Sequence, residues 1–410
     1  MTKRLRSLLV VEVMRAKPST VAVFKRERLG SSRPQAQEYN WIKAVETLEE
    51  YRPRGYHPIM VGDLLHDPIP YSMVAVKVSI ADSLPRETKV LIALSAPRPP
   101  SLPVHPGCSL VPILLDEFEV QGPNGRHICY IVAPTQCNLR DISFSRLFSR
   151  EVARPLSYGL TQAVAYMHSQ GYVHVFLSLD IHLNNVLIKL PSTLNDLSIK
   201  ELYDKYGEPE TVPVTQYNGE SLTPDVPAKA VLPLFLEKYA KQFSLSDARP
   251  LLSDFGDPFA PDLELRLGQD YNTSLAFRAP EAKFEPQAPL SYPSDVWSLA
   301  TAIWEINGMK AIFSTDFVHE DEIVSQYIDV LGPMPSESYL ENRWAPLEES
   351  FEVGRSEIKE EEKVVFLDLI RRMLTYRSEQ RPTAEGVLNS EWMLKWALPD
   401  HERSLKDPLG

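Results

Sequence analysis

Three polar segments of this sequence carry residue types suited to the chemistry of phosphate groups and divalent cations. In the first, Asp254 ends the apolar segment Leu251–Ser253 and opens an Asp-Phe-Gly triplet. A carboxylate at the end of a short strand can hold Mg²⁺ between phosphates, and the glycine lets the chain turn sharply. Taken alone this triplet is a weak signal, because an ordinary turn after a strand has the same composition.

The second segment places Asp180 five residues before Asn185, which opens the apolar run Val186–Ile188. This D-x-x-x-x-N spacing is typical of a catalytic loop, in which the aspartate accepts or orients the proton of an attacking hydroxyl. The amide oxygen of Asn185 suits a hard cation and predicts a second metal ligand. By itself such a pattern is more often a polar loop than a site.

The third segment is V-A-V-K, in which Lys77 closes an apolar strand. A lysine at this position can neutralise phosphate charge if an acidic partner holds its ammonium group in place. Glu87, in the next helical segment, is the expected partner. Without such a partner, a lysine at the end of a strand is usually a solvated surface residue.

Further motifs predict structural support for these residues. Glu281 in A-P-E and Arg381 in R-P-T carry opposite charges and are expected to meet as a buried pair. Asp295 opens an apolar helix and is expected to cap the backbone of the catalytic loop. Each motif alone is a weak signal. One chain, however, contains all of them in one order: V-A-V-K, the helical glutamate, D-x-x-x-x-N, D-F-G, A-P-E, D-V-W-S and R-P-T.

Two kinds of element must position these residues. Helical spacing is found in Glu87–Leu94, between segments with strand-like patterns, and Gly122–Gly125 is a hairpin signal. The strand-like segments are Tyr71–Val78, Leu110–Val120 and His127–Ala133. After Asn138 the apolar spacing becomes helical, as in Val152–Ser169, Ser294–Asn307 and Lys363–Leu374. We therefore predict an α+β fold of two lobes, a small β-rich N-lobe and a larger α-helical C-lobe.

The expected domain boundaries follow from these patterns. Residues 190–250 are rich in proline and include a helical segment over Ile199–Tyr206, so we expect an insertion on the surface of the C-lobe. The basic N-terminus has some features of a mitochondrial transit peptide, but Glu12 and Glu27 argue against one. The predicted divisions are a disordered or loosely attached extension (1–50), the N-lobe (51–135), the C-lobe (136–398) and a tail (399–410).

Composition limits the classes of function. The 410 residues include 43 Lys and Arg against 55 Asp and Glu, a net charge of −12. This balance argues against a general nucleic-acid binder and is compatible with a basic partner or peptide substrate. Three cysteines are too few for a disulfide framework and indicate a reducing compartment. No apolar run reaches the roughly 18 residues that cross a bilayer. Taken together, we expect a cytoplasmic or nuclear monomer that binds neither membrane nor nucleic acid.

On the ordered motifs, the chain resembles the eukaryotic protein kinases from about Tyr51 to Leu398. The segment Leu331–Pro335 is similar to the CMGC group. Within that group, G-Y-H-P at residues 55–58, the hairpin over residues 122–129 and the split before D-F-G are similar to SR-protein kinases, in particular a fungal SR-protein-kinase-like group. The resemblance implies a two-lobed kinase fold that uses ATP and Mg²⁺ and phosphorylates protein serines, with Arg/Ser-rich proteins as candidate substrates.

The resemblance also implies roles for single residues. Lys77 would hold the α- and β-phosphates, and Glu87 would hold Lys77. Asp180 would be the base, with Asn185 and Asp254 as magnesium ligands. The hinge that meets the adenine would be formed by Val132, Ala133, Pro134 and Thr135.

Two segments depart from the kinase pattern. Between Asp63 and Val74 there is no glycine where G-x-G-x-x-G is expected, and Pro68 and Pro70 have no N–H groups to cover phosphates. Five residues separate His174 from Asp180, four more than in the His-x-Asp pattern of kinases, and His182 stands where serine/threonine kinases usually have lysine. An extra loop there could displace the catalytic aspartate.

These departures leave three interpretations open. The preferred one is an active SR-protein-kinase-like enzyme that tolerates the changes. A pseudokinase that acts as a binding or scaffold module is the second. The third is a small-molecule phosphotransferase, because residues 180–185 also match a D-x-H-x-x-N loop. The segments A-P-E, D-V-W-S and R-P-T argue against the third, since those enzymes lack this helical substrate platform.

Overall fold

The chain divides into two compact units. A computed structural model describes residues 38–65, 73–96, 103–143, 148–174, 181–190, 197–233, 238–256, 258–270, 276–308, 310–313, 320–332 and 358–406. Unit 1 comprises residues 1–88, 114–134 and 192–237, and unit 2 comprises residues 89–113, 135–191 and 238–410. Sheets and helices occur among the described residues of both units, and the predicted α+β class is confirmed.

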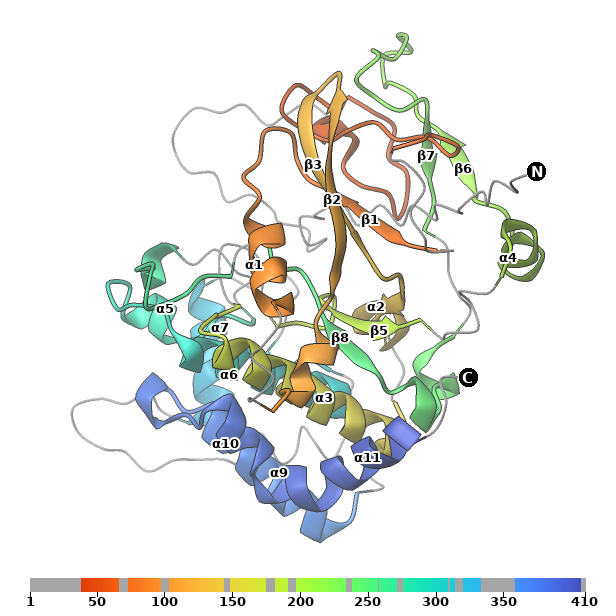
Figure 1. Cartoon of the computed structure of the whole chain (residues 1–410). Coiled ribbons are helices and arrows are strands. Elements are labelled where there is room, and N and C mark those ends of the chain that lie inside the picture. Colours follow the sequence, from red (N-terminus) through yellow and green to blue (C-terminus); the bar gives the residue numbers. More distant parts are fainter. Residues whose placement is uncertain are drawn as a thin grey trace. The chain divides into compact units, whose positions relative to one another are not determined.

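The main sheet of unit 1 is antiparallel, with strand order β1-β3-β2. The turn that joins β2 to β3 pairs Gly122 with Gly125, which confirms the predicted hairpin. Gly125 has a φ of +134°, a conformation that residues with a side chain rarely adopt. β-branched and apolar side chains of β1 and β3 form the core beneath this sheet. The strands are β1 (Ala75–Val78), β2 (Leu114–Gly122) and β3 (Gly125–Val132) (Figure 1).

Unit 1 has a second core, which joins residues 38–56 to residues 211–231. Tyr39 and Leu48 pack there with Val214 and Val226. Residues 192–237, which we expected on the surface of the C-lobe, therefore belong to unit 1, because their apolar side chains are buried against the N-terminal segment. The elements of this part are a short 3₁₀ helix (Leu48–Glu50), α4 (Ile199–Tyr206), β6 (Thr211–Pro213) and β7 (Lys229–Val231).

Unit 2 contains a small antiparallel sheet with strand order β4-β5-β8. Its strands are β4 (Thr135–Asn138), β5 (Val186–Lys189) and β8 (Pro250–Leu252). The two short strands expected beside Asn185 and Asp254 are present, and the structure shows that they pair with each other. Val186 pairs with Leu252 in this ladder, so the residues that follow β8 lie beside those that precede β5.

The helical part of unit 2 is built around α3 (Arg150–Ser169), whose residues 152–167 are nearly all buried. α6 (Tyr292–Gly308) packs against α3 and is buried on all sides, as expected for a helix at the centre of a core. α10 and α11 also contact α3 (Figure 1). The remaining helices are α1 (Arg86–Ser95), within which the unit boundary falls, α2 (Leu139–Ser143), α5 (Glu281–Phe284), α7 (Glu320–Leu331), α9 (Glu360–Met373), α10 (Ala384–Leu388) and α11 (Leu398–Lys406).

One guanidinium group connects three helices of unit 2. Arg154 of α3 donates hydrogen bonds to Glu362 of α9 at 2.6 and 2.9 Å and to Asp400 of α11 at 3.0 Å. Burial opposes the charge, but the hydrogen bonds and the two carboxylates outweigh it and raise the pKa of Arg154. A planar, always charged guanidinium suits such a shared position better than lysine does.

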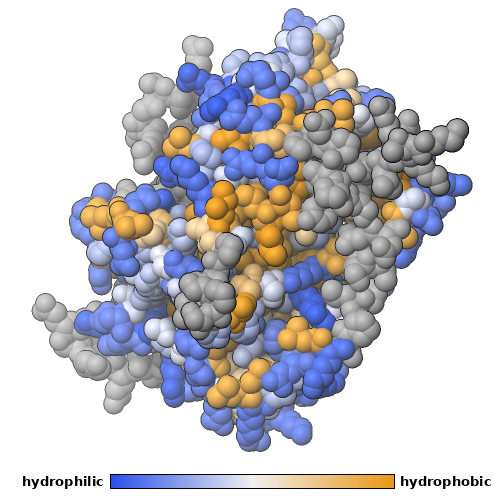
Figure 2. Space-filling view, in the orientation of Figure 1, coloured by the Kyte–Doolittle hydropathy of each residue, from blue (hydrophilic) through white to orange (hydrophobic). Residues whose placement is uncertain are grey.

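The surface carries the mixture of side chains usual for a folded domain. Hydrophilic and hydrophobic residues are interspersed on the face shown in Figure 2. No helix among the described residues is long and apolar enough to span a membrane. Cys108, Cys129 and Cys137 are free thiols.

His401 generates the first testable prediction. It lies in α11 against Tyr158 of α3, with ring centroids 4.8 Å apart, and burial lowers its pKa from 6.5 to about 4. Between these two pH values the unfolded chain binds a proton that the folded chain does not, so the free energy of unfolding falls as pH falls. From pH 7 to pH 5 we expect His401 to contribute a loss of about 2 kcal/mol.

Urea unfolding of the wild type and of His401→Gln at pH 7 and pH 5 measures this contribution. The variant carries no titratable group at this position and should lose less stability between the two pH values. An identical loss in both proteins would show that His401 is not buried in its neutral form.

Candidate active site

Lys77 and Glu87 form an ion pair within unit 1. The Lys77 Nζ atom lies 2.8 Å from Oε1 and 2.7 Å from Oε2 of Glu87, and the two side chains are only 11% and 14% exposed. Lys77 is in β1, opposite Tyr130 of β3, and Glu87 is in the first turn of α1. A spacing of ten residues is sufficient because the glutamate stands at the very start of the helix. A carboxylate is also favourable there, close to the positive end of the helix dipole.

The connection between β1 and α1 is held against β3. The backbone N–H of Ser79 donates to Ile128 O at 2.9 Å, and the Ser79 hydroxyl accepts the Ile128 N–H at 3.0 Å. Asp82 donates its N–H to Arg126 O at 2.7 Å and has a φ of +56°, an uncommon conformation for aspartate. These contacts fix the path by which the chain brings Glu87 back to Lys77.

Asn185 and Asp254 are brought together in unit 2 by the pairing of β5 with β8. Ser253, which follows β8, donates its N–H and its hydroxyl to Asn185 O at 2.8 and 3.0 Å. Asp254 comes next and has a φ of +66°. This left-handed conformation costs about 1–2 kcal/mol for a residue that is not glycine, and such strain concentrates at functional sites. Phe255 is fully buried against the ring of His174.

Asp295, at the start of α6, holds the segment that leads to the predicted catalytic loop. Its Oδ2 atom accepts the backbone N–H of His174 and lies beside Nε2 of His168, both at 2.8 Å. The His174 Nε2 atom is 3.1 Å from Ser253 O, next to Asp254. Asp295 is therefore a backbone anchor, as the sequence suggested, and it has a second partner, His168, that sequence reasoning missed.

His182 is buried close to this group and lies two positions after Asp180. Burial lowers its pKa to about 4, although the carboxylate of Asp254 opposes the shift. Its Nδ1 atom accepts the backbone N–H of Asn184 at 3.2 Å. His182 is thus neutral near pH 7 and does not supply the positive charge that a lysine would have at this position.

Glu281 and Arg381 form a buried ion pair in unit 2. Two parallel hydrogen bonds of 2.8 and 2.6 Å join the guanidinium to the carboxylate, and the side chains are 0% exposed for Arg381 and 8% for Glu281. The Ser294 hydroxyl also donates to Glu281 at 2.9 Å. Arg381 lies over the ring of Trp297 at 5.0 Å. The pair links α5, α6 and the segment before α10.

Of the remaining predicted site residues, the hinge segment belongs to the described residues and Asp180 does not. Val132 ends β3 and is buried, Ala133 and Pro134 follow it, and the chain enters unit 2 at Thr135. Asp180 and the preceding residues 175–179 lie outside the described residues, as do residues 66–72 of the glycine-free segment. Sequence reasoning also missed the pair between Arg140 and the buried Glu305, which no local motif announces.

The donor set of unit 2 fits magnesium. Mg²⁺ is commonly bound by one or two carboxylates together with substrate phosphates and water, rather than by a complete protein cage. Asn185 and Asp254 offer one amide oxygen and one carboxylate. The described residues contain no group of three His, Cys, Asp or Glu side chains that could hold a metal ion.

Together, the antiparallel N-terminal sheet with its Lys-Glu pair and the helical unit with its Asp-Phe-Gly strand define a protein-kinase fold. Comparisons with known proteins agree. Residues 244–393 match the family model described as protein kinase domain. A serine/threonine protein kinase from Aspergillus fumigatus is 27% identical over 350 residues, which cover 78% of each chain. The serine/threonine-protein kinase spk-1 of Caenorhabditis elegans is 27% identical over 175 residues, 35% of this chain and 17% of that protein. These findings support a eukaryotic protein kinase.

The Glu281–Arg381 pair generates a second prediction. Replacing Arg381 with alanine leaves a buried carboxylate without its cation, so we expect the free energy of unfolding to fall by about 3–5 kcal/mol. Arg377→Ala is the matched control, because its partner Glu379 and Arg377 itself are more than half exposed, and such a pair contributes at most about 1 kcal/mol.

Guanidinium-chloride unfolding of both variants tests this expectation. The double variant Glu281→Gln, Arg381→Met removes both charges and should be more stable than Arg381→Ala. Equal effects of Arg381→Ala and Arg377→Ala would contradict the assignment of a buried, structurally required pair.

Proposed function

We propose that this protein is a serine/threonine kinase of the SR-protein-kinase-like type, which transfers the γ-phosphate of ATP to serines in Arg/Ser-rich proteins. The observation that carries the proposal is the ion pair between Lys77 and Glu87. A solvated lysine at the end of a strand needs no fixed partner. An ammonium group held in one position by a nearly buried carboxylate is instead suited to bind phosphate oxygens. The similarity of the chain to named serine/threonine kinases supports the same conclusion.

Each residue has a distinct task in this proposal. Lys77 binds the α- and β-phosphates, and Glu87 orients the Lys77 ammonium. Asn185 and Asp254 bind Mg²⁺, and the left-handed backbone at Asp254 directs its carboxylate. When bound, Mg-ATP supplies the phosphoryl group that is transferred. Asp180 accepts the proton of the attacking serine hydroxyl, a role that rests on its D-x-x-x-x-N spacing alone.

The segment of Val132, Ala133, Pro134 and Thr135 is the proposed hinge for the adenine. β3 ends at Val132, so the backbone groups that follow are released from the sheet. Pro134 has no N–H and cannot donate a hydrogen bond to a base, which leaves the N–H groups of Ala133 and Thr135 and the carbonyl groups of the segment for that contact.

The substrate class rests on sequence likeness and charge. The net charge of −12 favours a basic peptide over an acidic one. The segments at residues 55–58 and 331–335 carry the likeness to SR-protein and CMGC kinases. The comparisons do not favour the pseudokinase alternative, because the relatives they find are named as kinases.

Transfer of labelled γ-phosphate from Mg-ATP to an Arg-Ser repeat peptide tests the proposed activity. Asp254→Asn removes the negative charge of a proposed metal ligand, so we expect the rate to fall at least about 100-fold. The matched control is Asp368→Asn, the same change at a half-exposed residue of α9, which should keep the wild-type rate.

The outcomes separate the open interpretations. Transfer by the wild type and by Asp368→Asn, but not by Asp254→Asn, is the expected result. If the folded wild type transfers no phosphate to any protein or peptide, the proposed activity is wrong and the pseudokinase alternative takes its place.

The Lys77–Glu87 pair gives a further prediction in a binding experiment. Glu87→Gln removes the charge that positions Lys77, and we expect the affinity for Mg-ATP to fall about tenfold. Glu119→Gln is the control, because Glu119 forms an exposed pair with Arg126 in the same unit. Titration with a fluorescent ATP analogue measures both variants, and equal affinities would exclude the positioning role of Glu87.

A further inference from the structure

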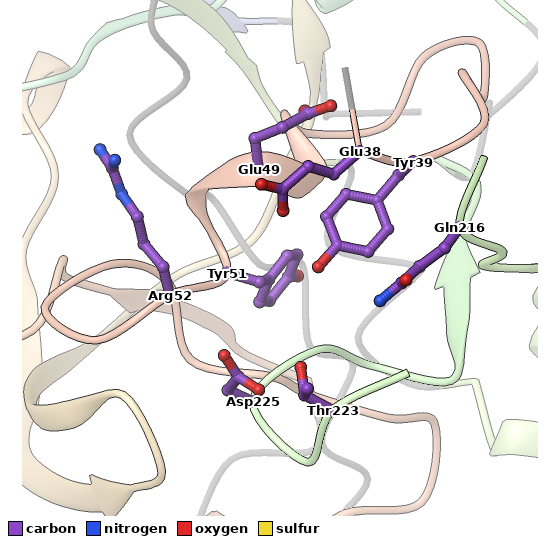
Figure 3. A pocket seen from close by; sticks show the side chains of 8 residues that line it. All are labelled: Glu38, Tyr39, Glu49, Tyr51, Arg52, Gln216, Thr223 and Asp225. Carbon is purple, nitrogen blue, oxygen red and sulfur yellow. The ribbon is translucent and has the colours of Figure 1, made fainter. Parts of the chain in front are cut away.

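Unit 1 contains a pocket whose lining includes none of the predicted site residues. Residues 38–52 and 216–225 line it, and its volume is about 240 Å³ (Figure 3). Sites for drug-sized molecules usually have about 300–1,000 Å³, so this pocket suits a single side chain better than a nucleotide. Its two walls come from segments separated by more than 160 residues in the chain.

The walls of the pocket are joined by backbone hydrogen bonds. Asn40 donates its N–H to Thr215 O, and Tyr217 donates its N–H to Glu38 O, both at 2.9 Å. On the other side, the buried side chain of Asn124, in the β2–β3 turn, donates to Asp225 O at 2.9 Å and to Tyr56 O at 2.6 Å. Tyr39 and Tyr51, which line the pocket, also belong to the second core of unit 1, so the packing of that core holds the lining in place.

Tyr39 presents a polar group to this pocket. The residue is only 6% exposed, and Figure 3 shows its hydroxyl directed into the space between the two walls. No described residue forms a hydrogen bond with this hydroxyl. Burial, followed by the nearby carboxylates of Glu38, Asp225 and Glu49, raises the pKa of Tyr39. The phenol is therefore neutral near pH 7, and a ligand can pair with it.

Three carboxylates, those of Glu38, Glu49 and Asp225, line the pocket together with Tyr39. None of Glu38, Glu49 and Asp225 forms an ion pair with a described side chain. The one cation of the lining, Arg52, is turned away from Tyr39 in Figure 3 and pairs with Glu50 at 3.1 Å. No group of three described His, Cys, Asp or Glu side chains is close enough to hold a metal ion. The acidic lining of the pocket therefore favours a ligand with a positive charge.

We infer that this pocket binds the side chain of an arginine in a basic peptide of another protein. A guanidinium group is planar and carries five N–H donors, so it can serve two carboxylates and a phenol oxygen together. It also stacks on aromatic rings such as that of Tyr51. A lysine ammonium carries its three donors on one nitrogen atom. It therefore reaches carboxylates on both walls of the pocket less well than a guanidinium group does.

This site goes beyond the proposed kinase activity. It contains none of the residues assigned to ATP, magnesium or proton transfer, and its occupation needs no nucleotide. A peptide that docks here while its serines react elsewhere would gain affinity from both contacts. Binding measured without ATP therefore tests the pocket separately from the proposed phosphate transfer.

The experiment measures binding of a short fluorescent Arg-Ser peptide to the full chain by fluorescence anisotropy. The matched ligand has citrulline in place of arginine, which keeps the shape of the side chain but removes its charge. We expect at least a tenfold loss of affinity with citrulline and a smaller loss with lysine. Equal binding of the arginine and citrulline peptides would overturn the inference.

Variants of the chain locate the binding. Asp225→Asn and Glu49→Gln should each weaken the arginine peptide about tenfold, and Tyr39→Phe should weaken it about three- to tenfold without lowering the melting temperature. The control, Glu220→Gln, makes the same charge change on the same segment, at an exposed residue outside the pocket, and should bind as the wild type does. If all four variants bind equally, attraction by net charge explains the affinity and the pocket does not.

Two further measurements fix the place and the source of the arginine. A photo-crosslinking group on the peptide should label residues 38–52 or 216–225, and labelling elsewhere alone would contradict the site. The first 37 residues of this chain carry nine Lys and Arg against two Glu. If a full chain with Arg26, Arg28 and Arg33 changed to glutamine binds the peptide more tightly, the pocket serves the chain's own arginines and the choice of an external peptide is wrong.

Discussion

The carboxylate of Asp295 is the contact on which the functional part of unit 2 depends. It is fully buried at the start of α6 and accepts the N–H of His174 while it lies beside the ring of His168 at the end of α3. A buried charge without such partners would cost several kcal/mol. Since His174 in turn reaches Ser253 O, this one group connects α3, α6 and the segment after β8 that carries Asp254.

Buried charges recur wherever the fold must hold one arrangement. Arg154 joins α3 to α9 and α11, Arg381 joins α5 to the start of α6, and Glu87 holds Lys77. Such pairs add little net stability, because desolvation offsets most of the attraction, but breaking one of them is costly. Their effect is therefore to specify geometry. In the first two cases the geometry is that of the helical core, and in the third it is the position of the Lys77 ammonium group beside α1.

Unit 1 is built around a small sheet, which has only three strands among the described residues. A sheet of this size buries little surface by itself. The second core, in which Tyr39, Leu48 and Tyr56 pack with Val214 and Val226, extends the apolar interior with a segment from elsewhere in the chain. The same packing leaves the hydroxyl of Tyr39 facing carboxylates from both segments, so stabilisation of the unit and formation of the pocket share one cause.

The sequence by itself was sufficient to predict the local elements and to single out the residues of the candidate site. Short-range periodicity located α3, α6 and α9, the glycines located the β2–β3 hairpin, and the motif spacing singled out Lys77, Glu87, Asn185 and Asp254, which the structure places on a strand, a helix start and two strand ends. These signals are readable because each depends on neighbours within a few residues. Only the tertiary structure decided that residues 192–237 pack with the N-terminal segment, that His168 shares Asp295, and that Tyr39 and Asp225 line one pocket. Those contacts join residues more than a hundred positions apart, and they depend on the fit of whole surfaces, which no local pattern encodes.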